Sequence, residues 1–361
     1  TEKPDAGIFM KEWLSLYESK SGERGMFNRA SAQAKAAENG RRDASWDFGT
    51  NPCSEIILRP NQFCNLTEVV VRSTDSVASL TRKIQIATLL GTIQSTFTDF
   101  GYLRKRWQNN TEEERLLGVS LTGIMDSPLM NGKEGVLEKT LKNLRSVAVK
   151  ANKYWAEKFG INQSTAITCV KPSGTVSQLV DSASGIHARH NPYYIRTVRG
   201  DNKDPLTEFM IASGIPNEPD VMKPEHTTVF SFPMKAPKGS VCRNDMTAIE
   251  QLELWKTYAQ HWCEHKPSVT ISVKEEEWVP VGAWCWENFS HLSGVSFLPF
   301  SDHTYQQAPY QDIDKATYEK LVKKMPTSID WQKLQDYEKE DSTKGSQELA
   351  CTAGVCELVD I

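Results

Sequence analysis

Apolar positions along the chain alternate between helical and strand-like spacing. Between 135 and 159 they recur at steps of three and four, and Gly160 follows where a helix-ending glycine belongs, which predicts a helix over 135–159. The next segment, STAITCV at 164–170, predicts a strand, and KPSGTVSQLV at 171–180 predicts a loop that enters a helix. This order is typical of α/β proteins.

The same reasoning assigns elements elsewhere in the chain. We expect a largely helical segment over residues 1–50, strands at 66–72 and 268–273, helices at 76–107 and 247–265, a short helix leading into a turn at 112–126, and loops with short elements at 191–235. Beyond residue 326 the chain is strongly polar, and 336–361 has the composition of a flexible tail.

Bulk composition narrows the function classes. A chain of 361 residues accommodates one large α/β domain or two smaller domains. The net charge is 42 − 46 = −4 without a basic stripe, which argues against nucleic-acid binding. No apolar run reaches the roughly 18 residues of a membrane helix, and the start of the chain does not resemble a signal peptide. Eight cysteines are too sparse for a disulfide scaffold, so we expect reduced thiols in the cytoplasm.

The candidate chemistry is concentrated in NPCSEIILRPNQFCNL, residues 51–66. It combines the thiols of Cys53 and Cys64, the carboxylate of Glu55 and the amide of Asn51, and its two prolines disfavour a helix. A carboxylate raises the pKa of a neighbouring thiol, and no histidine base is nearby, so thiolate nucleophilic chemistry is disfavoured. Redox or radical chemistry with a neutral S–H is favoured. Two buried structural cysteines are the alternative.

A second pair of cysteines, Cys351 and Cys356, lies in the polar tail. A zinc site needs two further ligands at similar spacing, and none is evident, so we expect no metal there. A dithiol on a flexible tail is suited to carrying reducing equivalents. A tail whose cysteines have no role is the alternative.

A third motif lies between a predicted strand and a predicted helix. Hydroxyls and backbone N–H groups at a helix start form a phosphate site, although the Walker lysine is missing and a plain N-cap explains the pattern equally well. The turn SGIH at 184–187 has the same character. The candidate phosphate-binding residues are Pro172, Ser173, Gly174, Thr175, Val176 and Ser177.

These motifs together resemble the catalytic subunit of ribonucleotide reductases. NPCSEI…CNL, KPSGTVSQLV…SGIH and a terminal Cys-x4-Cys occur in that order over nearly the whole chain. CNLTEVVVR, RLLGVSLTGIMD, SVTISVKEEEW and SGVSFLPF are most similar to the monomeric, adenosylcobalamin-dependent ribonucleoside-triphosphate reductases (class II). The resemblance implies adenosylcobalamin as cofactor and a ribonucleoside triphosphate as substrate.

The resemblance also implies roles for the residues of the first motif. Cys53 is implied to be the thiyl-radical cysteine that takes the 3′ hydrogen of the ribose. Glu55 is implied to be the base for the 3′-OH proton, and Asn51 to hydrogen-bond the ribose hydroxyls. Cys64 is implied to be one of two thiols that reduce the 2′ position.

The other two motifs receive roles in the same way. The Ser173–Ser177 loop is implied to hold the substrate phosphates. Cys351 and Cys356 are implied to re-reduce the site with electrons from a thioredoxin-like protein.

One departure from the family concerns the second reducing cysteine, which lies far upstream of the radical cysteine in that family. Here about fifty residues without a cysteine precede Cys53. The remaining cysteines do not stand where the family places that thiol, and we interpret them as core or incidental residues: Cys169, Cys242, Cys263 and Cys285.

The implied fold is therefore the C-terminal half of a ten-stranded α/β barrel. It covers residues 1–335 with the finger loop at 51–66, and a flexible redox-active tail follows at 336–361. We expect either a separate polypeptide that supplies the N-terminal half, or a fragment from a split gene or an intervening element; Thr1 fits a splice junction. Exposed strand edges predict poor solubility or oligomerisation of this chain alone.

Two other interpretations stay open. One is the corresponding half of a class I reductase, which takes its radical from a diiron partner. A C-terminal tyrosine pair would favour it, but Tyr193 and Tyr194 are mid-chain and followed by Ile-Arg. The other is a non-catalytic remnant that binds phosphate. A stand-alone dithiol oxidoreductase is disfavoured because no CxxC motif is present.

Overall fold

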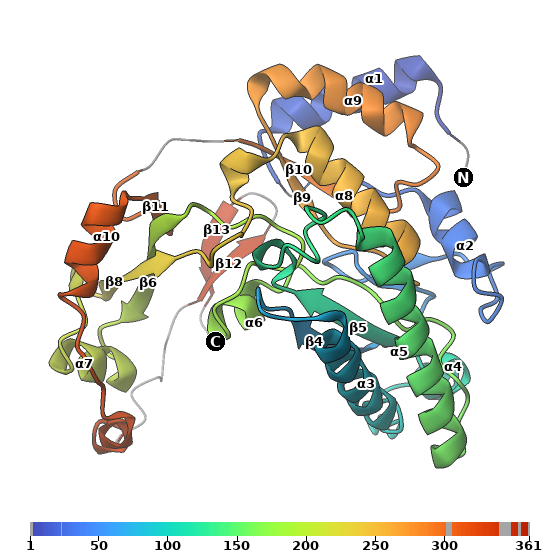
Figure 1. Cartoon of the computed structure of the whole chain (residues 1–361), viewed down its shortest axis with the longest axis horizontal. Coiled ribbons are helices and arrows are strands. Elements are labelled where there is room, and N and C mark those ends of the chain that lie inside the picture. The colour runs from blue at the N-terminus through green and yellow to red at the C-terminus, as the bar shows by residue number, and fades with distance from the viewer. Residues whose placement is uncertain (1–2, 23, 301–304, 339–347, 353–354, 360–361) are drawn as a thin grey trace. The chain divides into compact units, whose positions relative to one another are not determined.

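A computed structural model describes residues 3–22, 24–300, 305–338, 348–352 and 355–359. The chain divides into two compact units (Figure 1). Unit 1 comprises residues 1–189 and 237–301, and unit 2 comprises 190–236 and 302–361. Unit 2 thus consists of an insertion into unit 1 together with the C-terminal segment.

Unit 1 contains alternating helices and short strands. Its helices are α1 (Ala6–Ser19), α2 (Arg29–Ala37), α3 (Val77–Gln94), α4 (Lys105–Glu114), α5 (Leu137–Phe159), α6 (Gly174–Leu179), α8 (Ala248–His261) and α9 (Trp278–Glu287). Its strands are β1 (Gly25–Met26), β2 (Gly49–Thr50), β3 (Ile57–Leu58), β4 (Asn65–Val70), β5 (Leu117–Thr122), β9 (Thr270–Val273) and β10 (Val295–Pro299). Single 3-10 turns lie at Ile124–Asp126, Arg243–Asp245 and Glu275–Glu277.

Parallel extended segments form the centre of unit 1. Strands β4 and β5 pair in parallel from Asn65↔Leu117 to Val70↔Thr122. Isolated parallel bridges then join β5 to the segment predicted as a strand at 164–170, and this segment to Pro267, while β9 pairs in parallel with β10. Helices α3, α5, α8 and α9 lie in the successive connections between these segments. A parallel pair needs such a crossover, and this arrangement confirms the predicted α/β class.

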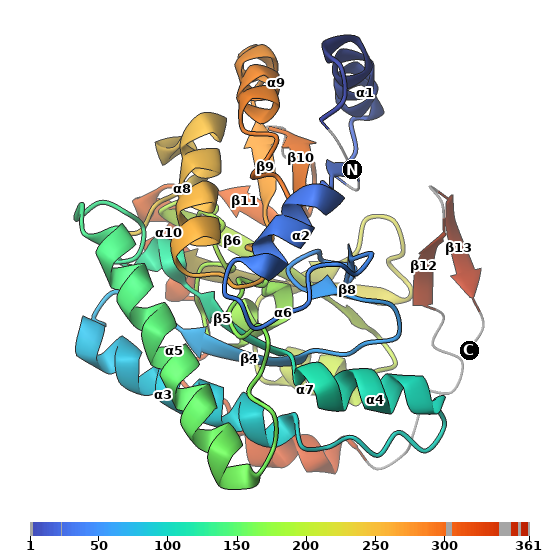
Figure 2. The same cartoon turned by 90° about the vertical axis from the view of Figure 1, so that its right-hand side faces the viewer.

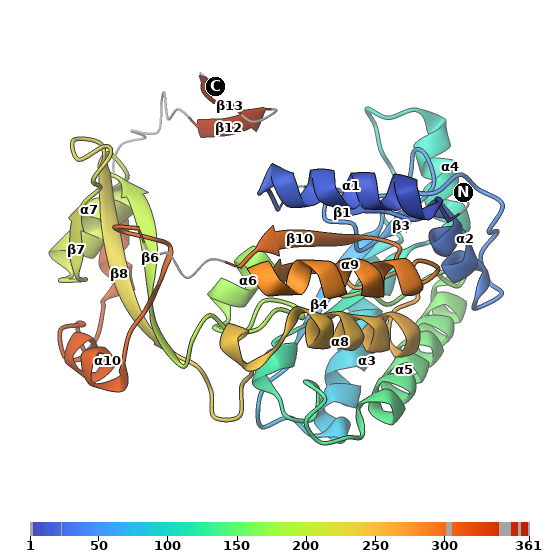
Figure 3. The same cartoon turned by 90° about the horizontal axis from the view of Figure 1, so that it is seen from above.

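The helices pack on the sheet through apolar and aromatic side chains. Trp255 and Tyr258 of α8 are fully buried, as is Trp262, which follows that helix. Each side chain donates one hydrogen bond of 2.8 Å to a backbone carbonyl: Trp255 to Pro267, Tyr258 to Met130 and Trp262 to Cys169. Figure 2 shows α3 and α5 on unit 1, and Figure 3 shows α1 beside α9, which agrees with the ring contacts between these two helices.

Three predicted helical regions can be compared with the structure. The helix at 135–159 is confirmed by α5, and Gly160 ends it with a φ of 66°. The helix expected over 76–107 ends early, because α3 stops at Gln94 and α4 begins only at Lys105. The short helix expected over 112–126 is wrong: α4 ends at Glu114, and β5 follows. The residues of β5 alternate between apolar Leu117, Val119 and Leu121 and small or polar side chains, but the acids at 112–114 favoured a helix start and outweighed this signal.

Unit 2 is built around a four-stranded antiparallel sheet in the order β11-β6-β8-β7. The loops expected at 191–235 are wrong, because β6 and β8 pair over nine residues, from Tyr193↔Lys235 to Asp201↔Thr227. The long strands escaped prediction because their partners are far apart in sequence. The elements of unit 2 are β6 (Tyr193–Asp201), α7 (Pro205–Ala212), β7 (Asn217–Pro219), β8 (Thr227–Lys235), β11 (Tyr310–Asp312), α10 (Lys315–Val322), a 3-10 turn (Trp331–Asp336), β12 (Glu348–Thr352) and β13 (Val355–Val359).

The predicted cysteine tail contains the hairpin of β12 and β13. Its backbone register pairs Cys351 with Cys356. The flexibility and redox role expected for this tail concern side chains and segments outside the described residues, so they stay predictions.

Candidate active site

The first half of the finger loop is the tip of a small β-hairpin. Strands β2 and β3 pair in antiparallel fashion, and residues 51–56 connect them. Two hydrogen bonds to Asn51 close this tip: its carbonyl accepts from the Ser54 N–H (2.9 Å), and its side-chain oxygen accepts from the Ile56 N–H (3.0 Å). Asn51 therefore shapes the loop through its oxygen atoms, and its side-chain NH₂ group is the part that can hydrogen-bond a ligand.

Cys53 lies at this tip and is exposed. Cys64, just before β4, is half-buried, and the four cysteines that we interpreted as core residues are buried. Burial raises the pKa of Cys64, so its thiol stays protonated at neutral pH. The loop thus places one accessible thiol at its tip and one sheltered thiol at its end.

Glu55 is fully buried directly after this exposed cysteine. One carboxylate oxygen, Oε1, accepts from Lys171 Nζ at 3.3 Å, and the other, Oε2, is buried without a hydrogen-bond partner. Burial lowers the pKa of Lys171, but the charge and hydrogen bond of Glu55 outweigh burial and raise it overall. A buried carboxylate with a free oxygen and a fixed counter-charge can accept a hydrogen bond or a proton from a ligand.

A second carboxylate lies close to the same lysine. Glu68 of β4 pairs in register with Ser120 of β5 and accepts from its hydroxyl at 3.2 Å. It also accepts from the Ser173 hydroxyl at 2.6 Å. Burial raises the pKa of Glu68, although Lys171 and both hydroxyls oppose this.

Sequence reasoning missed Lys171, Glu68 and Ser120. A signal existed for Glu68, because an acid in the β-branched run TEVVVR has to face a polar partner when the strand is buried. The pairing of Lys171 with Glu55 spans 116 residues and was not predictable.

Of the six predicted phosphate-binding residues, two are buried, three are exposed and Pro172 is half-buried. Ser173 and Ser177 are buried, and their hydroxyls bond to Glu68 and to the Gly174 carbonyl (3.2 Å), respectively. Gly174, Thr175 and Val176 are exposed at the start of α6. The groups that remain for an anion are therefore the backbone N–H groups of these three residues and the Thr175 hydroxyl.

The SGIH turn at 184–187 packs against the loop that precedes α6. Gly185 has a φ of 57°, and a Cβ atom there would overlap the Lys171 carbonyl. The Ser184 hydroxyl donates to the Pro172 carbonyl at 2.7 Å. The SGIH turn at 184–187 is thus in direct contact with the KPSG segment at 171–174.

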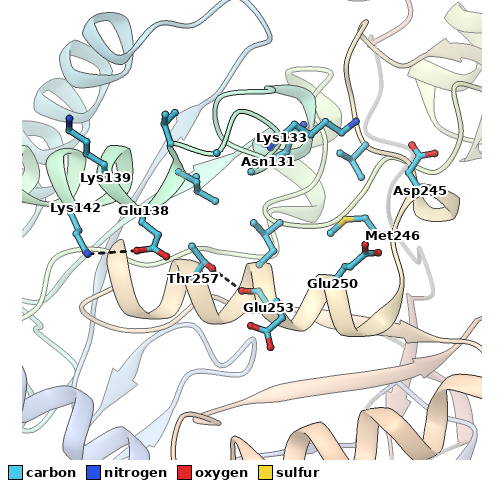
Figure 4. A pocket seen from close by; sticks show the side chains of 16 residues that line it. Asn131, Lys133, Glu138, Lys139, Lys142, Asp245, Met246, Glu250, Glu253 and Thr257 are labelled. Carbon is cyan, nitrogen blue, oxygen red and sulfur yellow. Dashed lines mark hydrogen bonds and ion pairs between the residues drawn. The ribbon is translucent and has the colours of Figure 1, made fainter.

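A separate groove of about 830 Å³ lies between the start of α5 and α8 (Figure 4). Its charged residues are of both signs: Glu138 pairs with Lys142 at 3.8 Å, and Glu250 and Lys133 also line it. It contains none of the predicted site residues. We assign no function to it.

Within the described ranges, no group of three or more His, Cys, Asp or Glu side chains is arranged to hold a metal ion. No helix among the same residues has the length and apolar character needed to cross a membrane.

The fold is that of the ribonucleotide reductases. A crystal structure of a B-12 dependent (class II) ribonucleotide reductase superposes with a TM-score of 0.78 at 23% identity, over 94% of this chain and 51% of that chain. In sequence, the chain is similar to the adenosylcobalamin-dependent ribonucleoside-triphosphate reductases of Lactobacillus delbrueckii subsp. bulgaricus (27% identity over 310 residues, 78% of this chain) and Euglena gracilis (28% over 316 residues, 86%). The chain spans 42% of the length of each of these relatives. No family model matches it. The resemblance inferred from the motifs is confirmed.

Proposed function

We propose that this chain carries the thiyl-radical cysteine of an adenosylcobalamin-dependent ribonucleoside-triphosphate reductase and forms part of that enzyme. The observation that carries the proposal is the hairpin tip, which presents the exposed thiol of Cys53 two residues before the buried Glu55, whose carboxylate pairs with Lys171. This placement fits a radical site, because Lys171 holds one carboxylate oxygen of Glu55 and the other oxygen has no partner and can accept a proton from the substrate. The named relatives support the same reaction.

In the proposed reaction, Cys53 as a thiyl radical takes the 3′ hydrogen atom of the ribose and later returns it. The Oε2 atom of Glu55, which is buried without a partner, accepts the 3′-OH proton and returns it to the 3′ oxygen later in the cycle. The 2′-OH leaves as water, and two thiols supply two electrons and two protons as they become a disulfide. Cys64, sheltered and protonated, is one of these thiols.

Adenosylcobalamin supplies the radical when it is bound, by homolysis of its cobalt–carbon bond. The thiol of Cys53 is exposed at the end of a hairpin, so it can contact a bound cofactor and give up its hydrogen atom. Cys53 is the residue that we assign to face the cofactor.

The substrate triphosphate is proposed to bind the exposed start of α6 through Gly174, Thr175 and Val176. Ser173 and Ser177 act indirectly, because their hydroxyls hold the loop in place. Cys351 and Cys356 are proposed to receive electrons from a thioredoxin-like protein and to pass them to the disulfide at Cys64. We place the reaction in the cytoplasm.

A second polypeptide is proposed to complete the barrel and to contribute the second reducing thiol. Exposed apolar side chains support this proposal: Ile86 and Leu90 on α3 are 50% and 55% exposed. Met10 of α1 and Val279 of α9 lie on an apolar groove of about 620 Å³. Surfaces of this kind are typical of interfaces.

The test combines this chain with the upstream half of a class II reductase, adenosylcobalamin, a dithiol and a ribonucleoside triphosphate. We expect 2′-deoxyribonucleotide to form, and we expect Cys53→Ser to abolish it. Cys285→Ala, at a buried cysteine of α9, is the matched control and should retain activity. No product, or product that persists in Cys53→Ser, would refute the proposal.

A further inference from the structure

A buried lysine lies beside the tip of the finger loop. Lys266 is 1% exposed, and its Nζ donates to the Ser54 hydroxyl at 2.9 Å and to the Ser293 carbonyl. Its backbone N–H donates to the Glu55 carbonyl at 3.1 Å. One residue of unit 1 thus contacts both residues that follow Cys53.

The surroundings of this lysine are closely packed. A Cβ atom on Gly294 would overlap both Lys266 Nζ and Ser54 Oγ, so only glycine leaves space for their hydrogen bond. The ring of Phe27 lies 5.0 Å from the ammonium. Burial lowers the pKa of Lys266 to about 7, although the charge of Glu55 opposes this.

Ser54 itself has an unusual backbone. Its φ of 66° lies in the left-handed region, which costs conformational energy for any residue other than glycine. The turn at Ser54 depends on the hydrogen bonds from the Ser54 and Ile56 N–H groups to Asn51. A fixed partner for the Ser54 hydroxyl therefore stabilises this turn over the extended conformations that serine prefers.

We propose that Lys266 is a positioning residue for Cys53: its ammonium, anchored on Ser293, holds the Ser54 hydroxyl and thereby fixes the turn that presents the thiol. The purpose of this contact rests on the proposed function, because a thiyl radical has to be held in register with one hydrogen of the substrate. Lys266 thus contacts the Ser54 hydroxyl, whereas Lys171 pairs with the Glu55 carboxylate.

The test is amide hydrogen exchange at Ser54 and Ile56 in the full chain, measured by mass spectrometry with residue-level fragmentation. We expect Lys266→Met and Ser54→Ala each to lower protection at these amides about tenfold, the factor for losing one hydrogen bond to a charged group. The double variant should lose no more than either single variant, because both changes remove one contact.

Lys256→Met is the matched control. Lys256 donates to the Asn288 side chain at 2.7 Å and does not contact the loop, so protection at Ser54 should stay unchanged. If Lys266→Met does not fold, Ser54→Ala still decides the question. Unchanged protection in the folded variants, or additive losses in the double variant, would overturn the proposal.

A pH series separates a charged contact from packing. Among the described residues, the charge of Glu55, which pairs with Lys171, acts on Lys266, and the Cys53 thiol directly precedes Ser54. Lys266 in turn acts on His265, whose pKa burial lowers well below its usual value. The ratio of exchange rates between Lys266→Met and the native chain should fall from about pH 6 to about pH 8, as the native lysine loses its charge. A constant ratio would overturn the role of the ammonium.

Exchange requires neither nucleotide nor cofactor. A chain without reductase activity but with the expected exchange would refute the proposed function and leave the positioning role intact. The reverse result would refute the positioning role alone.

Discussion

A buried ion pair between Arg42, which follows α2, and Glu114 at the end of α4 provides a direct test of stability. Arg42 and Glu114 form a two-pronged pair at 3.0 and 3.0 Å, with side chains that are only 1% and 3% exposed. Gln62 joins them: its side-chain oxygen accepts from Arg42 at 3.3 Å and from the Arg59 N–H at 3.1 Å. The network therefore fixes the part of the loop between Cys53 and Cys64.

Replacing Arg42 by methionine leaves Glu114 buried without its main partner. Breaking a buried pair from one side costs about 3–5 kcal/mol. Arg59 Nε lies 3.9 Å from the same carboxylate and retains part of the attraction. We therefore expect Arg42→Met to lower the free energy of unfolding by about 3 kcal/mol, at the lower end of that range.

Arg29→Met is the matched control, because the Arg29–Asp47 pair is shorter, at 2.7 Å, but 47% and 74% exposed. Exposed pairs contribute about 0–1 kcal/mol. Urea unfolding followed by tryptophan fluorescence measures both variants. A loss for Arg42→Met within about 1 kcal/mol of that for Arg29→Met would refute the reasoning that burial, not distance, sets the contribution.

Three further predictions concern other parts of unit 1. Lys171→Met should lower the free energy of unfolding by about 2–3 kcal/mol, less than the loss of a fully buried pair because this lysine is 29% exposed. Adding Glu55→Gln in the same chain should restore most of the lost stability, and no restoration would refute the pairing. Gly185→Ala should cost more than Gly160→Ala in urea unfolding, because both have positive φ but only Gly185 faces a backbone carbonyl; equal losses would contradict this. Burial lowers the pKa of His265 well below 6.5, so below about pH 6.5 the unfolded chain binds a proton that the folded chain does not. The free energy of unfolding should therefore decrease as the pH is lowered below about 6.5, by up to about 1.4 kcal/mol per pH unit. His265→Gln should reduce this slope, and an unchanged slope would exclude the effect.

Local signals predicted the elements that carry their own pattern. The helix at 135–159 has regular apolar spacing and a terminal glycine, and α5 confirms it. The strand at 66–72 is β-branched, and β4 confirms it within two residues. Strand β5 has an apolar alternation over Leu117–Thr122, but it directly follows the acids at 112–114, which favour a helix start, and the whole stretch was therefore mistaken for a helix.

The candidate site was predictable to the extent that it is local in sequence. Asn51, Cys53 and Glu55 belong to one motif, and the hairpin of β2 and β3 places them on one tip. The groups that set their environment come from far along the chain: Lys171 is 116 residues from Glu55, and Lys266 is 212 residues from Ser54. Only the packing of the parallel segments brings these residues together, and local sequence patterns do not predict contacts over such separations.

The most direct measurement of the central claim is an isotope competition. The complemented chain, with adenosylcobalamin and a dithiol, receives a mixture of ordinary and 3′-deuterated ribonucleoside triphosphate. If Cys53 takes the 3′ hydrogen, the ordinary substrate is converted to deoxynucleotide faster, and Cys53→Ser gives no product. Equal conversion of the two substrates, or product from Cys53→Ser, would contradict the account.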